Sequence, residues 1–104
     1  MFIAVRKYQV ERGAAAELAK QVRTGFVPLM RELEGFRGYY LLDGGPDVVV
    51  AISMFDSADT ALASNEKAAA WVRNHVLEFV RGTPEVMVGG VLVAEPSNAP
   101  DGAA

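Results

Sequence analysis

Apolar and polar residues follow two periods along the chain, and these divide it into strands and helices. Runs rich in β-branched and aromatic residues are typical of β-strands and lie at 2–10, 36–42, 48–55 and 85–94. Between them, residues 14–34 and 56–80 place apolar side chains three and four positions apart, which predicts two amphipathic helices. Gly25 and Pro28 interrupt the first helix, where we expect a kink or break because proline lacks the amide donor. The segment Gly82-Thr83-Pro84 is predicted to end the second helix.

The order of these elements, strand, helix, strand, strand, helix, strand, defines the fold class. Residues 43–47 form a turn, so the strands on either side of it are predicted to pair as an antiparallel hairpin. We therefore expect an α+β, ferredoxin-like β-α-β-β-α-β domain, in which two helices cover one face of a four-stranded antiparallel sheet. This single domain spans residues 1–95, and residues 96–104 are expected to form a flexible C-terminal tail.

The strands are apolar on both sides, although the helices can cover only one. In the strand at 48–55, one side carries Val48, Val50, Ile52 and Met54 and the other carries Val49, Ala51 and Phe55. An apolar face of several strands exceeds the area that soluble monomers usually expose. We therefore expect a homodimer through the open sheet face, with the two sheets packed as a dimeric α/β barrel.

Composition and charge narrow the range of partners. Hydrophobic residues make up 51% of the 104-residue chain and charged residues 22%, which is typical of a folded globule. The net charge of -3 provides no basic surface for nucleic acid. There is no cysteine and only one histidine, so we predict neither a metal site nor a bound cofactor. No apolar stretch approaches the roughly 20 residues that span a bilayer, so we expect no membrane partner and a cytoplasmic location.

The second predicted helix carries the most informative polar residues, although the chain contains no established catalytic motif. The apolar side of this helix is predicted to be formed by Leu62, Ala69, Val72, Val76, Phe79 and Val80. Asn65 falls on the same side, where its amide either bonds backbone or water at the core edge or points into a pocket. Trp71 and His75 lie one turn apart and can share a cavity. The alternatives are packing at a helix edge for Trp71 and a solvated position for His75.

Tyrosines of the first two strands complete the set of candidate ligand-binding residues. Tyr39 and Tyr40 occupy opposite faces of their strand, so one is expected to face the helices and the other the dimer partner. Tyr8 shares one side of the first strand with Arg6, and this pair could bind or polarise an aromatic ketone or phenol. The alternative for Tyr8 and Arg6 is interface packing with a surface ion pair. We select Tyr8 and Tyr40 as candidates alongside the three helix residues.

Two segments resemble the dimeric α/β-barrel superfamily, especially its antibiotic-biosynthesis-monooxygenase-like members. They are PLMRELEGFRGYYLLD at 28–43 and SNEKAAAWV at 64–72, within a resemblance that covers about residues 1–94. It implies a homodimer whose subunits each keep a small hydrophobic pocket between helices and sheet. Some such proteins oxidise polycyclic phenols with molecular oxygen and without metal or flavin, and an asparagine and a tryptophan of the second helix line their pocket. The resemblance implies this role for Asn65 and Trp71, whose spacing exceeds one helical turn.

Haem-degrading proteins of the same superfamily resemble this chain in having a helix tryptophan and a downstream, iron-binding histidine. His75 follows Trp71 too soon for that pattern, and Tyr8 and Gln9 stand where an asparagine is needed, so haem is not predicted.

The leading hypothesis is a small homodimer that binds an apolar or aromatic metabolite, with cofactor-independent monooxygenation of polycyclic phenols as the candidate reaction. The alternative is a non-catalytic small-ligand-binding or dimerisation module.

Overall fold

A computed structural model describes residues 1–96 of the chain, as four strands and two helical regions. The strands are β1 (Phe2–Val10), β2 (Phe36–Asp43), β3 (Val48–Phe55) and β4 (Val80–Gly90). The first helical region consists of α1 (Ala15–Gln21), the π-helical segment η1 (Val22–Phe26) and α2 (Val27–Arg31). The second consists of α3 (Ala58–Trp71), the π-helical segment η2 (Val72–Val76) and the 3₁₀ turn η3 (Leu77–Phe79). The predicted tail lies outside the described residues except for its first position.

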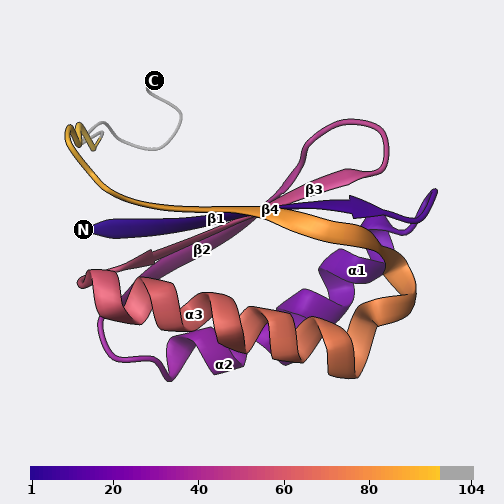
Figure 1. Ribbon diagram of the computed structural model, residues 1–104, viewed down its shortest axis with the longest axis horizontal. Helices are drawn as coiled ribbons and strands as arrows, with labels where there is room; N and C mark the ends of the chain where they lie inside the picture. Colours follow the sequence, from indigo (N-terminus) through magenta and orange to yellow (C-terminus); the bar gives the residue numbers. More distant parts are fainter. Residues whose placement is uncertain (97–104) are drawn as a thin grey trace.

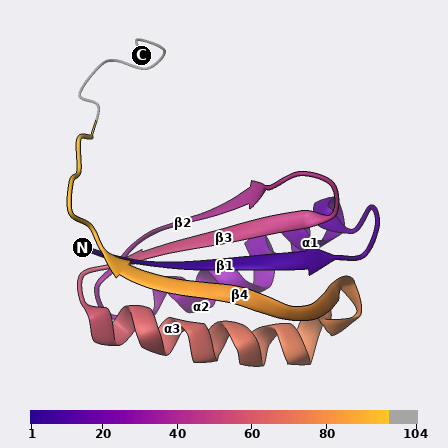
Figure 2. The ribbon, with the colours of Figure 1, turned by 45° about the horizontal axis from the view of Figure 1, so that its top comes forward.

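The four strands form one antiparallel sheet in the order β2-β3-β1-β4. Both helical regions lie on the same face of this sheet, and the opposite face carries no element of the described chain (Figures 1 and 2). The two central strands, β1 and β3, pair from Phe2 with Phe55 to Gln9 with Val48. The predicted ferredoxin-like β-α-β-β-α-β fold is therefore confirmed.

Alternation along the central strands separates a core face from an open face. In β1 the core face is formed by Ala4, Arg6, Tyr8 and Val10, and in β3 by Val49, Ala51, Ser53 and Phe55. The open face is crossed by a row of directly paired residues formed by Tyr40, Ile52, Val5 and Met87. Its outer members are exposed, Tyr40 at 60% and Met87 at 66%. The open face is thus as apolar as the sequence pattern predicts.

The last strand differs from its prediction at both ends. It begins at Val80, so Gly82-Thr83-Pro84 lies inside β4 and does not end the helix. Gly82 has a φ of +68°, and the pairing of β1 with β4 shifts register between Lys7 and Gln9, which identifies a bulge in this region. The predicted strand over 85–94 ends at Gly90, after which Leu92 is 97% exposed. The prediction that Gly82 helps to end the preceding helix is therefore wrong, because this glycine lies inside β4.

The buried side of α3 also differs from the prediction, by one position along the helix. Its buried residues are Ala61, Ser64, Ala68 and Trp71, whereas Leu62 is 56% exposed and Ala69 is exposed. Three of these four side chains are small, which lets the helix approach the sheet closely. The side of α3 that faces the core is therefore the one that carries Trp71.

None of the helices within residues 1–96 has the length and apolar character needed to cross a lipid bilayer.

Candidate functional site

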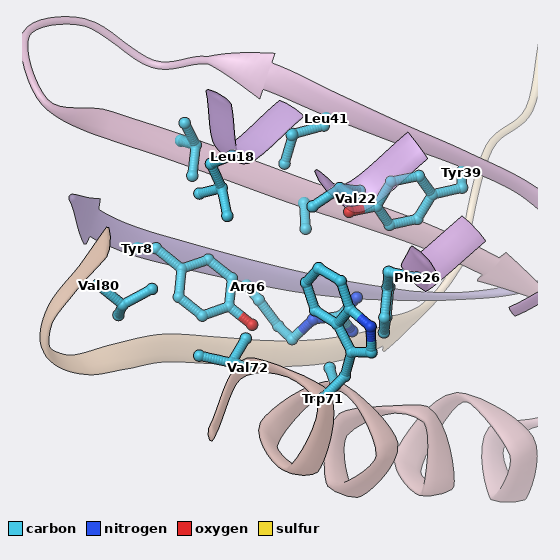
Figure 3. Close-up of a pocket in the computed structure, with 13 residues that line it drawn as sticks. Arg6, Tyr8, Leu18, Val22, Phe26, Tyr39, Leu41, Trp71, Val72 and Val80 are labelled. Carbon is cyan, nitrogen blue, oxygen red and sulfur yellow. The ribbon is translucent and has the colours of Figure 1, made fainter. Parts of the chain in front are cut away.

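A cavity lies between the sheet and the helices, and aromatic side chains dominate its lining (Figure 3). Tyr8 and Tyr39 reach it from the sheet, Phe26 from η1 and Trp71 from the end of α3, together with Arg6 from β1. The space between the lining atoms is about 360 Å³ when its mouth toward solvent is included, and about 30 Å³ of it is open to a water-sized molecule. The cavity in this conformation is therefore nearly filled by its own side chains, and a planar ligand has to displace some of them.

The two π-helical segments place the aromatic residues of the cavity. A π turn is one residue longer than an α turn and is often found at functional sites. In η1 the amide of Val27 donates to the carbonyl of Val22, five residues earlier, and Phe26 ends this segment pointing into the core. The second segment, η2, begins directly after Trp71. Both helices are therefore distorted at the positions that contribute to the cavity.

Phe26 and Trp71 form the centre of an aromatic cluster. Their ring centroids are 5.4 Å apart at an interplanar angle of 52°, and Phe26 meets Tyr39 edge-on at 5.6 Å. Gly25 allows this arrangement, because a Cβ atom at that position would lie 3.1 Å from Cζ2 of the Trp71 indole. The predicted interruption at Gly25 and Pro28 is therefore present as a π turn and a close helix-to-indole contact.

Arg6 is the charged residue of the cavity and is only 2% exposed. Its Nη1 donates to Asn65 Oδ1 at 3.0 Å and its Nη2 donates to Ser53 Oγ at 2.9 Å. Both acceptors are neutral, and the Cζ atom lies 5.8 Å from the centre of the Phe26 ring, a cation–π arrangement. The ion pairs found within residues 1–96 join Lys7 to Glu85 and Arg37 to Asp56. The expected surface ion pair of Arg6 is therefore wrong, since its guanidinium is buried without a carboxylate.

Two phenols share the cavity with this cation. Burial raises the pKa of Tyr39 to about 12, and the positive charge of Arg6 offsets part of the rise. Burial also raises the pKa of Tyr8, again against the lowering effect of Arg6. Both phenols therefore stay protonated at neutral pH and can donate hydrogen bonds, but they cannot act as bases.

The structure brings some of the sequence-predicted site residues together and separates others. Tyr8 and Trp71 line the cavity, and Asn65 lies one hydrogen bond away from it through Arg6. Tyr40 points from the open face of the sheet, as the alternation with Tyr39 predicts. His75 is exposed, and its ring lies 5.4 Å from the Trp71 ring on the outer side of the helix. Neither Tyr40 nor His75 reaches this cavity, but His75 and Trp71 together line a second, more open hollow between the two helical regions, as their one-turn spacing predicts.

Sequence reasoning gave too little weight to Phe26 and Arg6. Phe26 was expected only as one of the apolar positions of the helix predicted over 14–34, and the alternative for Arg6 was a surface ion pair. The signal for Arg6 was present in β1, where alternation places it on the same face as Ala4, Tyr8 and Val10.

Within residues 1–96, no three histidine, aspartate or glutamate side chains gather in a way that could hold a metal ion.

Fold and cavity together define a small α+β domain that encloses an apolar site between its sheet and helices. The family model described as "Antibiotic biosynthesis monooxygenase" matches residues 1–82 of the chain. The protein therefore belongs to the antibiotic biosynthesis monooxygenase family, as the sequence resemblance implies. No match was found among curated proteins.

Solved structures share this fold at low sequence identity. A monooxygenase from the ActVA-Orf6 gene of Streptomyces coelicolor, in complex with nanaomycin D, has a TM-score of 0.70 and 19% identity, and the match covers 92% of each chain. A protein of unknown function from Nitrosomonas europaea has a TM-score of 0.75 and 17% identity, with 94% of this chain and 95% of that chain covered. A variant of MhuD with two manganese protoporphyrin IX molecules bound per active site has a TM-score of 0.72 and 20% identity, with 93% and 100% covered.

Proposed function

We propose that the protein is a homodimer that binds a planar, apolar or aromatic metabolite in the cavity of each subunit and oxidises it with molecular oxygen. The observation that carries this proposal is the aromatic cavity itself, with its buried cation and two protonated phenols. Ligand sites are typically apolar clefts with a few polar groups that fix orientation. Family membership and the neighbour that binds nanaomycin D support a small organic ligand.

The lining suits ring binding better than it suits acid–base catalysis. Phe26, Trp71 and the two tyrosines offer aromatic faces and edges to a planar ligand. The phenols of Tyr8 and Tyr39 donate hydrogen bonds but hold their protons too tightly to act as bases. The chemistry therefore has to come from the bound molecule, with the protein orienting it and keeping water away.

The proposed reaction balances without a further reductant. A phenol and O₂ give a quinone and water: the phenol O–H bond and one ring C–H bond break, and a new C–O bond forms to one atom of O₂. The ring supplies four electrons, and the second oxygen atom leaves as water with both protons. An electron-rich ring in an apolar site is the group that would react with O₂.

Dimerisation follows from the open face of the sheet. The row of Tyr40, Ile52, Val5 and Met87 has apolar side chains that no element within residues 1–96 covers. A second copy placed face to face would cover this row and give the two-sheet arrangement of a dimeric α/β barrel.

Binding can be tested with the fluorescence of Trp71, which is the only tryptophan of the chain. Hydroxylated naphthalenes and anthracenes should quench or shift this emission in the wild type. Ala68→Leu should abolish the response because Ala68 is buried in the cavity lining. Ala63→Leu is the matched control, since the same change is made at an exposed position of the same helix. Equal binding by both variants would show that the ligand does not enter this cavity.

Catalysis is tested by oxygen uptake with the same compounds. The wild type should consume oxygen and form a quinone, and Trp71→Phe should slow turnover by disturbing ring orientation. Asn65→Ala should also slow it, because Arg6 would lose the acceptor of its Nη1 hydrogen bond. Ligand binding without oxygen uptake would refute the oxidation and favour the non-catalytic binding module.

The homodimer is tested by sedimentation equilibrium of matched variants. Tyr40→Glu places a charge in the open face, and Leu62→Glu places one on the exposed side of α3. The wild type and Leu62→Glu should sediment as dimers, whereas Tyr40→Glu should dissociate. A monomeric wild type, or equal effects of the two substitutions, would contradict pairing through the sheet.

A further inference from the structure

The guanidinium of Arg6 is a buried cation without an anion. Among the residues that line the cavity, Arg6 is the only charged one, and it is 2% exposed. We infer that Arg6 binds an anionic oxygen of the ligand, so that the pocket selects a planar apolar molecule carrying one oxyanion, a phenolate, enolate or carboxylate. This inference rests on the proposed function, because it assigns the ligand class of the same cavity.

The hydrogen bonds of Arg6 leave part of its donor capacity unused. A guanidinium has five N–H groups; the structure assigns one to Asn65 and one to Ser53, and the guanidinium also interacts with the phenol oxygens of Tyr8 and Tyr39. The Nε atom is buried and has no partner within residues 1–96. Buried donors are nearly always satisfied in folded proteins, so an orphan of this kind points to a missing partner. A ligand oxygen in the cavity can supply it.

The positive charge of Arg6 is a second, independent indication that the ligand is an anion. Asn65 and Ser53 are neutral, so they orient the guanidinium but do not neutralise it. An unpaired charge in an apolar site is strongly unfavourable, whereas a close anion offsets that cost. The neighbouring phenols cannot be this anion at neutral pH, because burial raises the pKa of both Tyr8 and Tyr39.

The position of Arg6 fits binding of a ring as well as of its oxygen. Figure 3 shows Arg6 entering the cavity between the phenol rings of Tyr8 and Tyr39, and its Cζ atom lies 5.8 Å from the centre of the Phe26 ring. A planar ligand in contact with these rings would bring a substituent oxygen to the guanidinium. The protein as a whole carries a net charge of -3, so any preference for anions has to arise locally at Arg6.

A pair of probes that differ only in charge tests this inference on the wild type. We would titrate the protein with 2-naphthoate and with the neutral 2-naphthamide at neutral pH, and follow binding by Trp71 fluorescence and calorimetry. Charge-assisted hydrogen bonds strengthen binding roughly tenfold to a hundredfold, so the carboxylate should bind tighter by about that factor. In a second arm, the absorbance of 2-hydroxy-1,4-naphthoquinone is followed while the pH is lowered, because this acidic quinone is already ionised in water at neutral pH. Binding should keep the bound molecule ionised at a lower pH than the free molecule.

Variants then locate the preference. Arg6→Gln should bring the affinities for 2-naphthoate and 2-naphthamide to within about threefold of each other. The substitution removes the positive charge, whereas the new amide can still contact Asn65. Arg6→Lys keeps the charge and should keep part of the preference. Arg23→Gln removes an exposed arginine of η1 and should behave as the wild type. Circular dichroism of each variant shows whether it is folded.

The outcomes separate the two proposals. Preference for naphthoate alone would assign carboxylates to the site, and preference for the ionised quinone alone would assign phenolates and enolates. Equal binding of all neutral and charged probes by the wild type would overturn the role of Arg6 and leave the aromatic pocket intact. Loss of the preference in Arg23→Gln would also overturn it. Absence of any binding would overturn both the pocket and the oxyanion.

Discussion

The pKa of Tyr39 provides a quantitative test of how far water is excluded from the cavity. Its pKa is raised to about 12 by burial, from 10.0 for a free phenol, so the folded protein holds the neutral form more tightly than the unfolded chain does. Below about pH 9 both states carry the proton, and Tyr39 has no effect on the pH dependence of stability. Above pH 10 the unfolded chain ionises first, so the free energy of unfolding falls as pH rises.

The size of this fall follows from the two pKa values. Linkage gives a loss of about 1.3 kcal/mol between about pH 9 and pH 11, and about 1 kcal/mol more by about pH 12. Tyr39→Phe removes the group, so its unfolding free energy should decline less than that of the wild type by about 1.3 kcal/mol over the first interval.

Urea unfolding at fixed protein concentration, followed by circular dichroism at several pH values, measures this difference. The comparison cancels the other titrating groups, and an unchanged denaturant slope shows that the unfolding transition is comparable. Parallel pH curves for the two proteins would mean that Tyr39 ionises as readily in the folded state as in the unfolded one. That result would remove the argument that the phenols are protonated donors in a water-poor cavity.

Three further substitutions test the contacts that build the site. Gly25→Ala places a methyl group against the Trp71 indole and should weaken ligand binding measured by fluorescence, whereas Thr24→Ala at the neighbouring exposed position should not. Ser57→Ala removes the N-cap hydrogen bond to the Thr60 amide and should cost about 1 kcal/mol in urea unfolding, with Ser57→Asp retaining stability. Phe55→Ala removes a fully buried ring and should cost about 3–5 kcal/mol; a loss below about 1 kcal/mol would contradict the assigned core.

Strand positions were predictable because alternation and β-branched runs are local signals. The bounds of β1 and β3 agree with the sequence pattern, and so does the opposite orientation of Tyr39 and Tyr40. The start of β4 was not predictable in this way. Gly82-Thr83-Pro84 has the composition of a helix terminator, but Gly82 adopts its left-handed φ within a bulged strand.

The candidate site was predictable only in part, because it depends on close packing between elements. Hydrophobicity alone placed Leu62 in the core, whereas the structure buries Ala61, Ser64 and Ala68, whose small side chains let α3 approach the sheet. That rotation brings Trp71 inward and leaves His75 outside. The partners of Arg6 lie 47 and 59 residues away in the chain, a separation that no local pattern reveals.

The two π turns also affect how this chain is compared with its relatives. Each contains one residue more than the α turn that would join the same flanking helices, and the extra residue rotates everything after it by about 100°. A relative that lacks the insertion would need a one-residue gap near 22–26 or 72–76 to stay in structural register. Alignments made without such gaps would match the positions around Trp71 and His75 to the wrong side of the helix and transfer residue roles to side chains that point elsewhere.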